Sequence, residues 1–346
     1  MAKYLAQVSA LACVSLAFSA ASPSRADVKL RLEISVGYPV TDLAYSPDGS
    51  IIAVAVVKGA DQGGSPPLDV RLFSSTDGKL IATLKGHKKE ASKLAFVPDG
   101  RFLISGAEDG ECIIWDVKEH RQVASLKGES EQVGYVAVSP DGKQLAICDV
   151  KKHVEIWDIA SRKRVVDFTT GEGIMCLAFS PKGNLLAGGT ENGALRFWDM
   201  RKLKKIRESP SDDRHTKMVR ALLFTSQGKE LLSAGLDGRL TIWRVESNEL
   251  ILPAGEMHLS DTPETVAASA DGRVIVFGCN GGLIFYDSSF LKERYTLPGP
   301  ICLSHIAYET DDYIMATKFH PKKNELIIGG GDGKVKVWSD PPTFKK

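Results

Sequence analysis

The chain has 346 residues, 25% of them charged, and its formal net charge is +1. This composition is close to that of an ordinary globular protein, and a charge so near zero favours neither a nucleic-acid nor a membrane partner. Length alone would suggest two or three domains, but an array of repeats can occupy the whole chain as one closed domain.

Residues 1–26 have the pattern of a secretory signal peptide. Lys3 is the only charge before Arg25, apolar and small residues fill positions 5–18, and a small-x-small end precedes Asp27. We expect cleavage near Ala26-Asp27 and an extracytoplasmic protein, periplasmic or secreted, of a bacterial kind. The alternatives are an uncleaved anchor, which the polar residues within the run disfavour, and lipid attachment at a cysteine whose preceding residues match a lipobox poorly.

The mature chain gives no sign of a disulfide framework or a metal site. Its five cysteines, an odd number at irregular spacing, mostly lie in strand-like apolar runs, where cysteine acts as a small core residue. No C-x-x-C pair occurs, so we expect no zinc site and no cofactor. The cysteines are Cys112, Cys148, Cys176, Cys279 and Cys302.

From residue 40 onward the sequence repeats. Each of seven short alternating runs carries an aromatic residue at the same phase, and the intervals between successive members are 42, 42, 41, 45, 43 and 52 residues. All five tryptophans of the chain belong to this series, which is Phe73, Trp115, Trp157, Trp198, Trp243, Tyr286 and Trp338.

A second marker keeps the same period. Tetrapeptides with proline and glycine in tight-turn positions occur at 46–49, 97–100 and 139–142, and degraded versions occur in the later repeats. Between this turn and the aromatic residue lie an apolar strand and another turn, such as Glu108-Asp109-Gly110. Each repeat is therefore predicted to form four short antiparallel strands, which we letter a to d.

These residues resemble the WD40 repeat family, whose period is about 40–45 residues. The Trp-Asp dipeptide itself survives at 115–116, 157–158 and 198–199. The resemblance implies an all-β fold: a single seven-bladed WD40-type β-propeller over residues 27–346, with four antiparallel strands per blade. It says much about the fold and little about the function.

The resemblance also implies a buried structural network in two blades. In the family it runs from an Asp in the b–c turn through a His and a Ser to the Trp indole. Repeats two and five hold the full set, and the corresponding members differ by 128 residues in every case: His87, Ser105, Asp109 and Trp115, and then His215, Ser233, Asp237 and Trp243. The other repeats lack it, with Ile147, Gly188 and Ile328 at the Ser position, so we expect those blades to rely on packing alone.

The last repeat ends too early. Pro341 and Pro342 follow Trp338 closely and rule out a further paired strand. Residues 28–36 alternate between charged and apolar and have no other partner, so we expect this strand to act as strand d of the seventh blade. It would join the two ends of the chain and leave no open edge on that blade.

Partner contacts are expected on the face that carries the b–c and d–a loops. Insertions at 58–67, 207–214 and 298–313 fall on this face, and loops on rigid scaffolds carry function disproportionately. The third insertion contains an amphipathic contact set, Tyr308, Asp311, Asp312 and Tyr313. Residues that open strand a are expected to ring the mouth of the channel: Glu90, Gln132, Met175, Arg220 and Met315.

Basic residues gather in the c–d loops of repeats two to four, which share the opposite face. A solvated rim is the favoured interpretation, and attraction to an anionic surface such as lipid headgroups or a polyanion is the alternative. No aromatic residues interleave with them, which argues against single-stranded nucleic acid. The set is Lys118, Arg121, Arg162, Lys163, Arg164, Arg201, Lys202, Lys204, Lys205 and Arg207.

We therefore expect a non-catalytic, monomeric scaffold that binds a protein or peptide partner and no nucleic acid, with membrane contact the less favoured alternative. An extracytoplasmic propeller enzyme or ligand binder would need converging polar groups in the channel. The strand-a positions expected there are mostly apolar or small: Leu43, Leu94, Val136, Leu177, Leu222 and Ala316. A third hypothesis is an adaptor to an anionic surface through the basic c–d loops.

Overall fold

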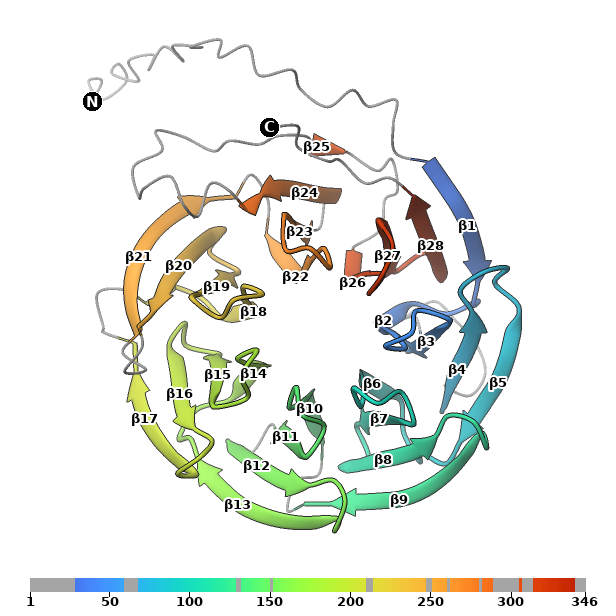
Figure 1. The fold of residues 1–346 in the computed structure, drawn as a ribbon, viewed down its shortest axis with the longest axis horizontal. Coiled ribbons are helices and arrows are strands. Elements are labelled where there is room, and N and C mark those ends of the chain that lie inside the picture. Colours follow the sequence, from blue (N-terminus) through green and yellow to red (C-terminus); the bar gives the residue numbers. More distant parts are fainter. Residues whose placement is uncertain are drawn as a thin grey trace, which may run out of the picture.

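The protein is described by a computed structural model that places residues 29–58, 68–128, 132–149, 152–209, 214–246, 251–259, 262–279, 282–288, 305–306 and 314–339. Its numbered elements are all strands, and they form seven four-stranded antiparallel sheets arranged as blades around one ring (Figure 1). The prediction of a seven-bladed β-propeller is confirmed. Within the described residues, no helix is long and apolar enough to cross a bilayer.

The blades are numbered along the chain, and strands a to d run from the ring axis to the rim. Blade one consists of β2 (Val40–Tyr45), β3 (Ile51–Val56), β4 (Asp69–Ser74) and β5 (Leu80–Lys85). Blade two consists of β6 (Ala91–Phe96), β7 (Phe102–Ala107), β8 (Glu111–Asp116) and β9 (Arg121–Lys127). Blade three consists of β10 (Val133–Val138), β11 (Gln144–Asp149), β12 (His153–Asp158) and β13 (Lys163–Thr169). Blade four consists of β14 (Ile174–Phe179), β15 (Leu185–Thr190), β16 (Leu195–Asp199) and β17 (Lys204–Glu208). Blade five consists of β18 (Val219–Phe224), β19 (Glu230–Gly235), β20 (Arg239–Val245) and β21 (Ile251–His258). Blade six consists of β22 (Pro263–Ala268), β23 (Val274–Cys279), β24 (Gly282–Asp287) and β25 (His305–Ile306). Blade seven is β26 (Ile314–Phe319), β27 (Glu325–Gly330), β28 (Lys334–Ser339) and β1 (Lys29–Ser35).

The repeat marker has a packing role. Every aromatic residue of the series lies near the end of its strand c, and Trp115, Trp198, Trp243 and Tyr286 are among the largest fully buried side chains. Their apolar surfaces fill the clusters between neighbouring blades, as Trp115 does with residues of blades one and two. Because a fully buried aromatic side chain removes a large area from water, this one position per repeat contributes strongly to stacking the blades.

The ring closes as the sequence predicts. β1 pairs antiparallel with β28 from Lys29 opposite Ser339 to Ser35 opposite Lys334, and it lies on the rim beside β28 in Figure 1. Arg31 adds a side-chain link, because its guanidinium lies 3.1 Å from the Glu325 carboxylate and donates to the Ser75 carbonyl of blade one. The two ends of the chain are therefore held to each other and to the first blade.

One prediction about the ring axis is wrong. Leu43, Leu94, Val136, Leu177 and Ala316 are at most 6% exposed, so they pack between the blades and do not line the axis, and Leu222 is partly buried. The reason is a β-bulge at the second residue of strand a, which recurs in all seven blades. A bulge inserts one extra residue, and this shifts every later side chain to the other face of the strand.

Candidate functional site

Blade two contains a closed chain of hydrogen bonds beneath its loops. The Trp115 indole donates to Ser105 Oγ at 2.8 Å, Ser105 lies 2.6 Å from His87 Nε2, and His87 Nδ1 lies 3.2 Å from Asp109 Oδ2. Trp can only donate and a carboxylate can only accept, so this order fits a neutral imidazole that carries its proton on Nδ1. Each of the four side chains in this hydrogen-bond network then has a partner.

Blade five repeats this arrangement at the positions that the sequence places 128 residues further on. Trp243 donates to Ser233 Oγ at 2.9 Å, His215 Nε2 lies 2.8 Å from the same oxygen, and His215 Nδ1 lies 3.0 Å from Asp237 Oδ1. Burial acts to raise the pKa of Asp237, but hydrogen bonds from His215 and from the backbone N–H groups of Thr216 and Arg239 hold that pKa well below its usual range. The carboxylate is therefore the fixed charge of the network.

The two aspartates also organise the loops above them. Asp109 accepts the Lys88 N–H at 2.7 Å and the Glu111 N–H at 3.0 Å, so one carboxylate holds both the d–a loop and the b–c turn. His215 goes further, because its own N–H donates to Gly193 of blade four at 3.0 Å while its ring belongs to blade five. A Cβ at Gly193 would lie 1.9 Å from the His215 carbonyl oxygen, so this inter-blade contact requires glycine.

The expectation that the other blades rely on packing alone is wrong. Four of them carry a charged residue near the middle of strand c, two residues before the aromatic position, where blades two and five have Ile113 and Thr241. Each is paired with a nearby acid, base or carbonyl. These strand-c charges are Arg71, Glu155, Arg196 and Lys336 in blades one, three, four and seven.

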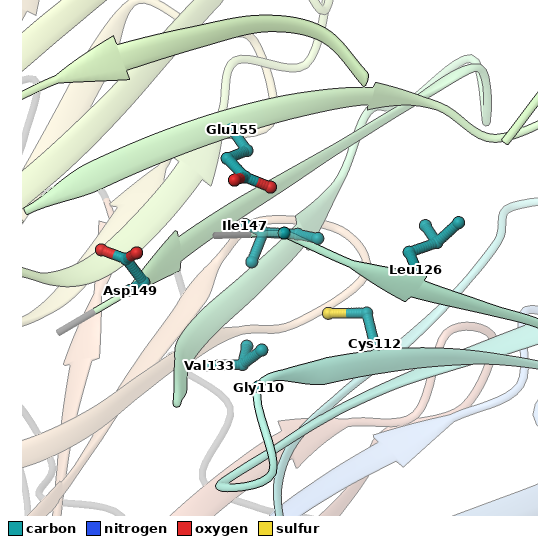
Figure 2. A pocket seen from close by; sticks show the side chains of 8 residues that line it. Gly110, Cys112, Leu126, Val133, Ile147, Asp149 and Glu155 are labelled. Atoms are coloured by element: carbon teal, nitrogen blue, oxygen red, sulfur yellow. The ribbon is translucent and has the colours of Figure 1, made fainter. Parts of the chain in front are cut away.

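In blade three the strand-c charge replaces the serine as acceptor. Trp157 donates its indole N–H to Glu155 Oε2 at 2.8 Å, and Arg164 of strand d lies 2.9 Å from Glu155 Oε1. Ile147 occupies the serine position, and it lines a small pocket with Glu155, Asp149 and Cys112 (Figure 2). The carboxylate therefore satisfies the indole without a histidine relay.

Blade four uses a buried arginine. The Arg196 guanidinium, only 9% exposed, lies 3.3 Å from Glu172 of the loop entering the blade and 3.4 Å from Glu208 of strand d. Burial acts to raise the pKa of Glu172, but Arg196 and further contacts hold it below its usual range. Gly188 stands at the serine position, and a Cβ there would lie 2.9 Å from the Trp198 ring, so glycine makes room for the indole.

The residues predicted to ring the axis mouth stand at or directly before the start of strand a in five blades. Glu90 and Gln132 come directly before strand a of blades two and three, whereas Met175, Arg220 and Met315 are the second residues of β14, β18 and β26. All are partly or well exposed. Glu90 Oε1 accepts the Lys58 N–H of blade one at 2.7 Å and so links two blades. Tyr308, Asp311, Asp312 and Tyr313 lie outside the described residues.

Sequence reasoning missed polar residues on the innermost strands. Glu264, at the second position of β22, accepts two hydrogen bonds from the Arg220 guanidinium across the boundary between blades five and six. Lys93 Nζ lies 5.0 Å from the centroid of the Tyr135 ring. The signal was available, because Glu264 aligns with Met175 and Arg220 once the repeats are superposed. A β-bulge in strand a precedes Lys93 and Tyr135 and turns them toward the ring axis, and the hydrophobic pattern of the sequence does not reveal this bulge.

The predicted basic residues lie at the c–d turns and at the start of the outer strands. Arg162, Lys163, Arg201, Lys202, Lys204 and Lys205 are exposed. Several form surface ion pairs: Arg201 and Lys202 lie 3.7 and 3.4 Å from Asp199, Lys205 lies 3.4 Å from Glu208, and Arg164 pairs with Glu155. The Arg207 side chain lies outside the described part of the structure.

In the described part of the chain no three His, Cys, Asp or Glu side chains gather as a metal site.

Seven four-stranded blades, a repeated terminal tryptophan in strand c and the Asp–His–Ser–Trp chain define a WD40-repeat β-propeller. Residues 39–339 match the family model described as the IFT122 first beta-propeller, and the chain belongs to that family. The solved β-propeller domain of Cps50 (Swd1) from Myceliophteria thermophila superposes with a TM-score of 0.73 at 18% identity, over 91% of this chain and 100% of that one, which shows the shared fold.

Curated relatives are eukaryotic proteins. Periodic tryptophan protein 2 of Arabidopsis thaliana is 24% identical over 305 residues, which are 84% of this chain and 31% of that protein. The WD repeat-containing protein 55 homolog of Drosophila persimilis is 25% identical over 313 residues, 86% of this chain and 51% of that protein. The chain thus spans about a third to a half of these relatives. Propellers of this kind are typically protein-interaction scaffolds, and the relatives give no support to a bacterial source.

Proposed function

We propose that this chain is a non-catalytic scaffold that binds a protein or peptide partner on its loop face, defined as the b–c and d–a loops together with the axis mouth. The observation that carries the proposal is the set of hydrogen bonds that hold the loops of this face to one another and across blades. The His215 N–H and the Glu90 carboxylate each join two blades, and Asp109 and Asp237 fix the loops in blades two and five. A preset surface loses little conformational entropy on binding.

The axis mouth supplies the contact chemistry. Met175 and Met315 present flexible apolar side chains at equivalent positions of blades four and seven, and Met315 is 36% exposed. Methionine adapts its shape to a partner more readily than a branched side chain. Between them lie Arg220 and Glu264, whose pairing holds a charged patch in place. A partner that inserts an apolar residue beside a polar one would complement this arrangement.

The test is site-specific photo-crosslinking in the native host. A photoreactive amino acid replaces Met315, and the matched control replaces Leu80, an exposed apolar residue on the outer strand of blade one. We expect a protein adduct from position 315 and none of the same mass from position 80. Met315→Asp should then weaken binding of that identified partner about tenfold. Equal adducts at both positions, or an unchanged affinity, would contradict the proposal.

A second candidate function is a small-ligand site on the innermost strands. Polar groups of neighbouring blades meet there: Lys93 Nζ lies 5.0 Å from the centroid of the Tyr135 ring, and the Arg220 guanidinium donates to Glu264. Burial also raises the pKa of the Tyr135 hydroxyl. Native mass spectrometry of the purified protein tests this idea. A retained small molecule that Tyr135→Phe releases would support it, whereas an unliganded mass at every desolvation energy would contradict it.

We also propose that the protein is exported. The support lies in the sequence of residues 1–26, with its single early lysine, apolar run and small-x-small end before Asp27. The intact mass of the protein from fractionated host cells tests the proposal. A mature chain that begins at Asp27 in an extracytoplasmic fraction is the expected result, and a full-length species in the cytoplasm would overturn it while leaving the loop-face proposal intact.

A further inference from the structure

The face opposite the loop face carries a basic sector of its own. It consists of the c–d turns and adjoining outer-strand residues of three consecutive blades, two to four, which follow one another along the rim (Figure 1). All of its members are exposed. They are Lys118, Arg121, Arg162, Lys163, Arg164, Arg201, Lys202, Lys204 and Lys205.

In blades two and four one acid of the c–d turn is buried and holds the turn backbone. Asp116 accepts the N–H groups of Lys118 and Glu119 at 3.1 and 2.9 Å, and Asp199 accepts those of Arg201 and Lys202 at 2.9 and 3.1 Å. Their side chains are only 9% and 2% exposed. Asp158, the acid of the blade three turn, is partly exposed, and Glu119 is exposed, so the exposed bases outnumber the accessible acids of the three turns and the surface that a partner meets is positive.

Part of the positive charge is uncommitted. Within the described residues, no ion pair joins Arg162, Lys163 or Lys204 to a carboxylate. The neighbouring a–b turns border the sector, because the Val117 N–H donates to the Arg101 carbonyl and the Ile159 N–H donates to the Lys143 carbonyl, which places these turns side by side. The Arg101 and Lys143 side chains are 68% and 77% exposed, and each is paired with an acid, at 3.8 Å from Asp116 and 4.0 Å from Asp141.

An exposed β-branched residue follows the bases on two neighbouring outer strands. Val165 of β13 is 46% exposed and Ile206 of β17 is 39% exposed, and each comes directly after two basic residues. The same order of groups therefore recurs one blade apart along the rim. Since Val165 and Ile206 lie on the strands beyond the turn tips, a segment running along the rim reaches them, whereas a flat bilayer meets the tips first.

We propose that this sector binds an extended, acidic protein segment that lies across the c–d turns of blades two to four. Glutamate and aspartate side chains would pair with the uncommitted bases, and apolar residues between them would cover Val165 and Ile206. The loop face takes no part in this contact, so the proposal stands or falls separately from the proposed partner of that face. The propeller would then bind a different kind of partner on each of its two faces.

The experiment measures binding of a fluorescent peptide in which glutamates are separated in turn by valine and serine, long enough to cross three blades. The test variant combines Arg162→Asn, Lys163→Gln and Lys204→Gln; asparagine suits position 162 because its φ is 61°. The control variant removes the same charge from the loop face by Lys88→Gln, Lys89→Gln and Lys217→Gln, all at exposed positions. Thermal unfolding confirms that both variants are folded.

We expect the peptide to bind the wild-type protein and the control variant equally, and to bind the test variant about tenfold more weakly. Binding should also weaken as salt rises, because exposed charges are screened. Three results would overturn the proposal: no peptide binding to the wild type, equal weakening in both variants, or binding to phosphatidylserine-containing vesicles and not to the peptide. The last result would assign the sector to a membrane surface.

Discussion

Blades two and four anchor the loop that enters the blade by different chemistry. In blade two a relay of four groups runs from an indole through a neutral imidazole to a carboxylate, and each hydrogen bond has one defined donor and one defined acceptor. In blade four a single buried guanidinium stands between two glutamates that come from different elements. The relay needs four residue types at four positions, whereas the ion-paired arrangement needs one central charge and tolerates partners from either side.

Because of this difference, a repeat that lacks the histidine and serine of the relay can still hold its blade by polar contacts. Loss of the histidine and serine does not remove the polar anchor of a blade, because the strand-c position can supply a charge instead. The two solutions should respond differently to mutation. A relay should lose stability when any buried donor or acceptor is left without a partner. An ion-paired core should lose stability when one charge is removed, and it should regain stability when the opposite charges are removed as well.

The largest effect is expected from Asp237→Ala. The substitution leaves the buried Nδ1–H of His215 and the backbone N–H groups of Thr216 and Arg239 without their acceptor. We expect a loss of about 3 kcal/mol in the free energy of unfolding, measured by urea denaturation. Asp237→Asn keeps an acceptor and should lose about half as much. A loss under about 1 kcal/mol for the alanine variant would show that water replaces the carboxylate.

Arg196→Met should have the next largest effect, about 2 kcal/mol. It removes the charge between Glu172 and Glu208, which are about a quarter exposed and would then repel each other. The triple variant Arg196→Met, Glu172→Gln, Glu208→Gln tests the cause, because it removes all three charges together. We expect it to recover most of the lost stability in the same denaturation assay. A triple variant no more stable than the single one would assign the loss to packing.

Ser105→Ala and Ser233→Ala test whether the two relays act independently. Each removes a hydroxyl that contacts both a histidine and an indole, so each should cost about 1.5 kcal/mol. The two serines share no partner and lie in blades two and five, so the double variant should lose the sum. Calorimetry of the four proteins checks this expectation. A double variant that loses clearly more than the sum would mean that the two networks are coupled through the ring.

Much of the fold was predictable because its signals are local and periodic. The aromatic series, the turn tetrapeptides and the unpaired strand at the N-terminus lead to seven blades and to the pairing of β1 with β28. The relay members were placed by resemblance to the WD40 family and checked by their equal offset of 128 residues, and the hydrogen bonds described above join those eight residues.

The features that sequence reasoning missed depend on geometry between elements. Glu155 and Arg196 stand at alternating positions of a strand, where a charged residue ordinarily indicates a solvated face. They are buried because strand d and the entering loop cover them, and their partners come from segments at varying distances along the chain. Likewise, the bulge in strand a reverses which side chains meet the axis, and it follows from backbone geometry that residue types do not encode.

The smallest expected effect is a pH dependence that separates His87 from His153. Burial lowers the pKa of His87, so its contribution to stability is present above the unfolded value of about 6.5 and is lost as pH falls through the folded value. The hydrogen bond to the Asp167 carboxylate raises the pKa of His153, which gives the opposite slope: stability present below about pH 6.5 and lost as pH rises.

Unfolding midpoints measured from pH 5 to pH 8 in His87→Gln and His153→Gln test this separation. Relative to wild type, His87→Gln should lose less stability on acidification, because its neutral side chain no longer favours the unfolded state there. His153→Gln should lose more, since it no longer gains an ion pair with Asp167 in acid, although solvent around this partly exposed pair keeps the change small. Parallel curves for all three proteins would mean that neither histidine changes its protonation on folding, and that the relay in blade two is held by geometry without electrostatic selection of the neutral imidazole.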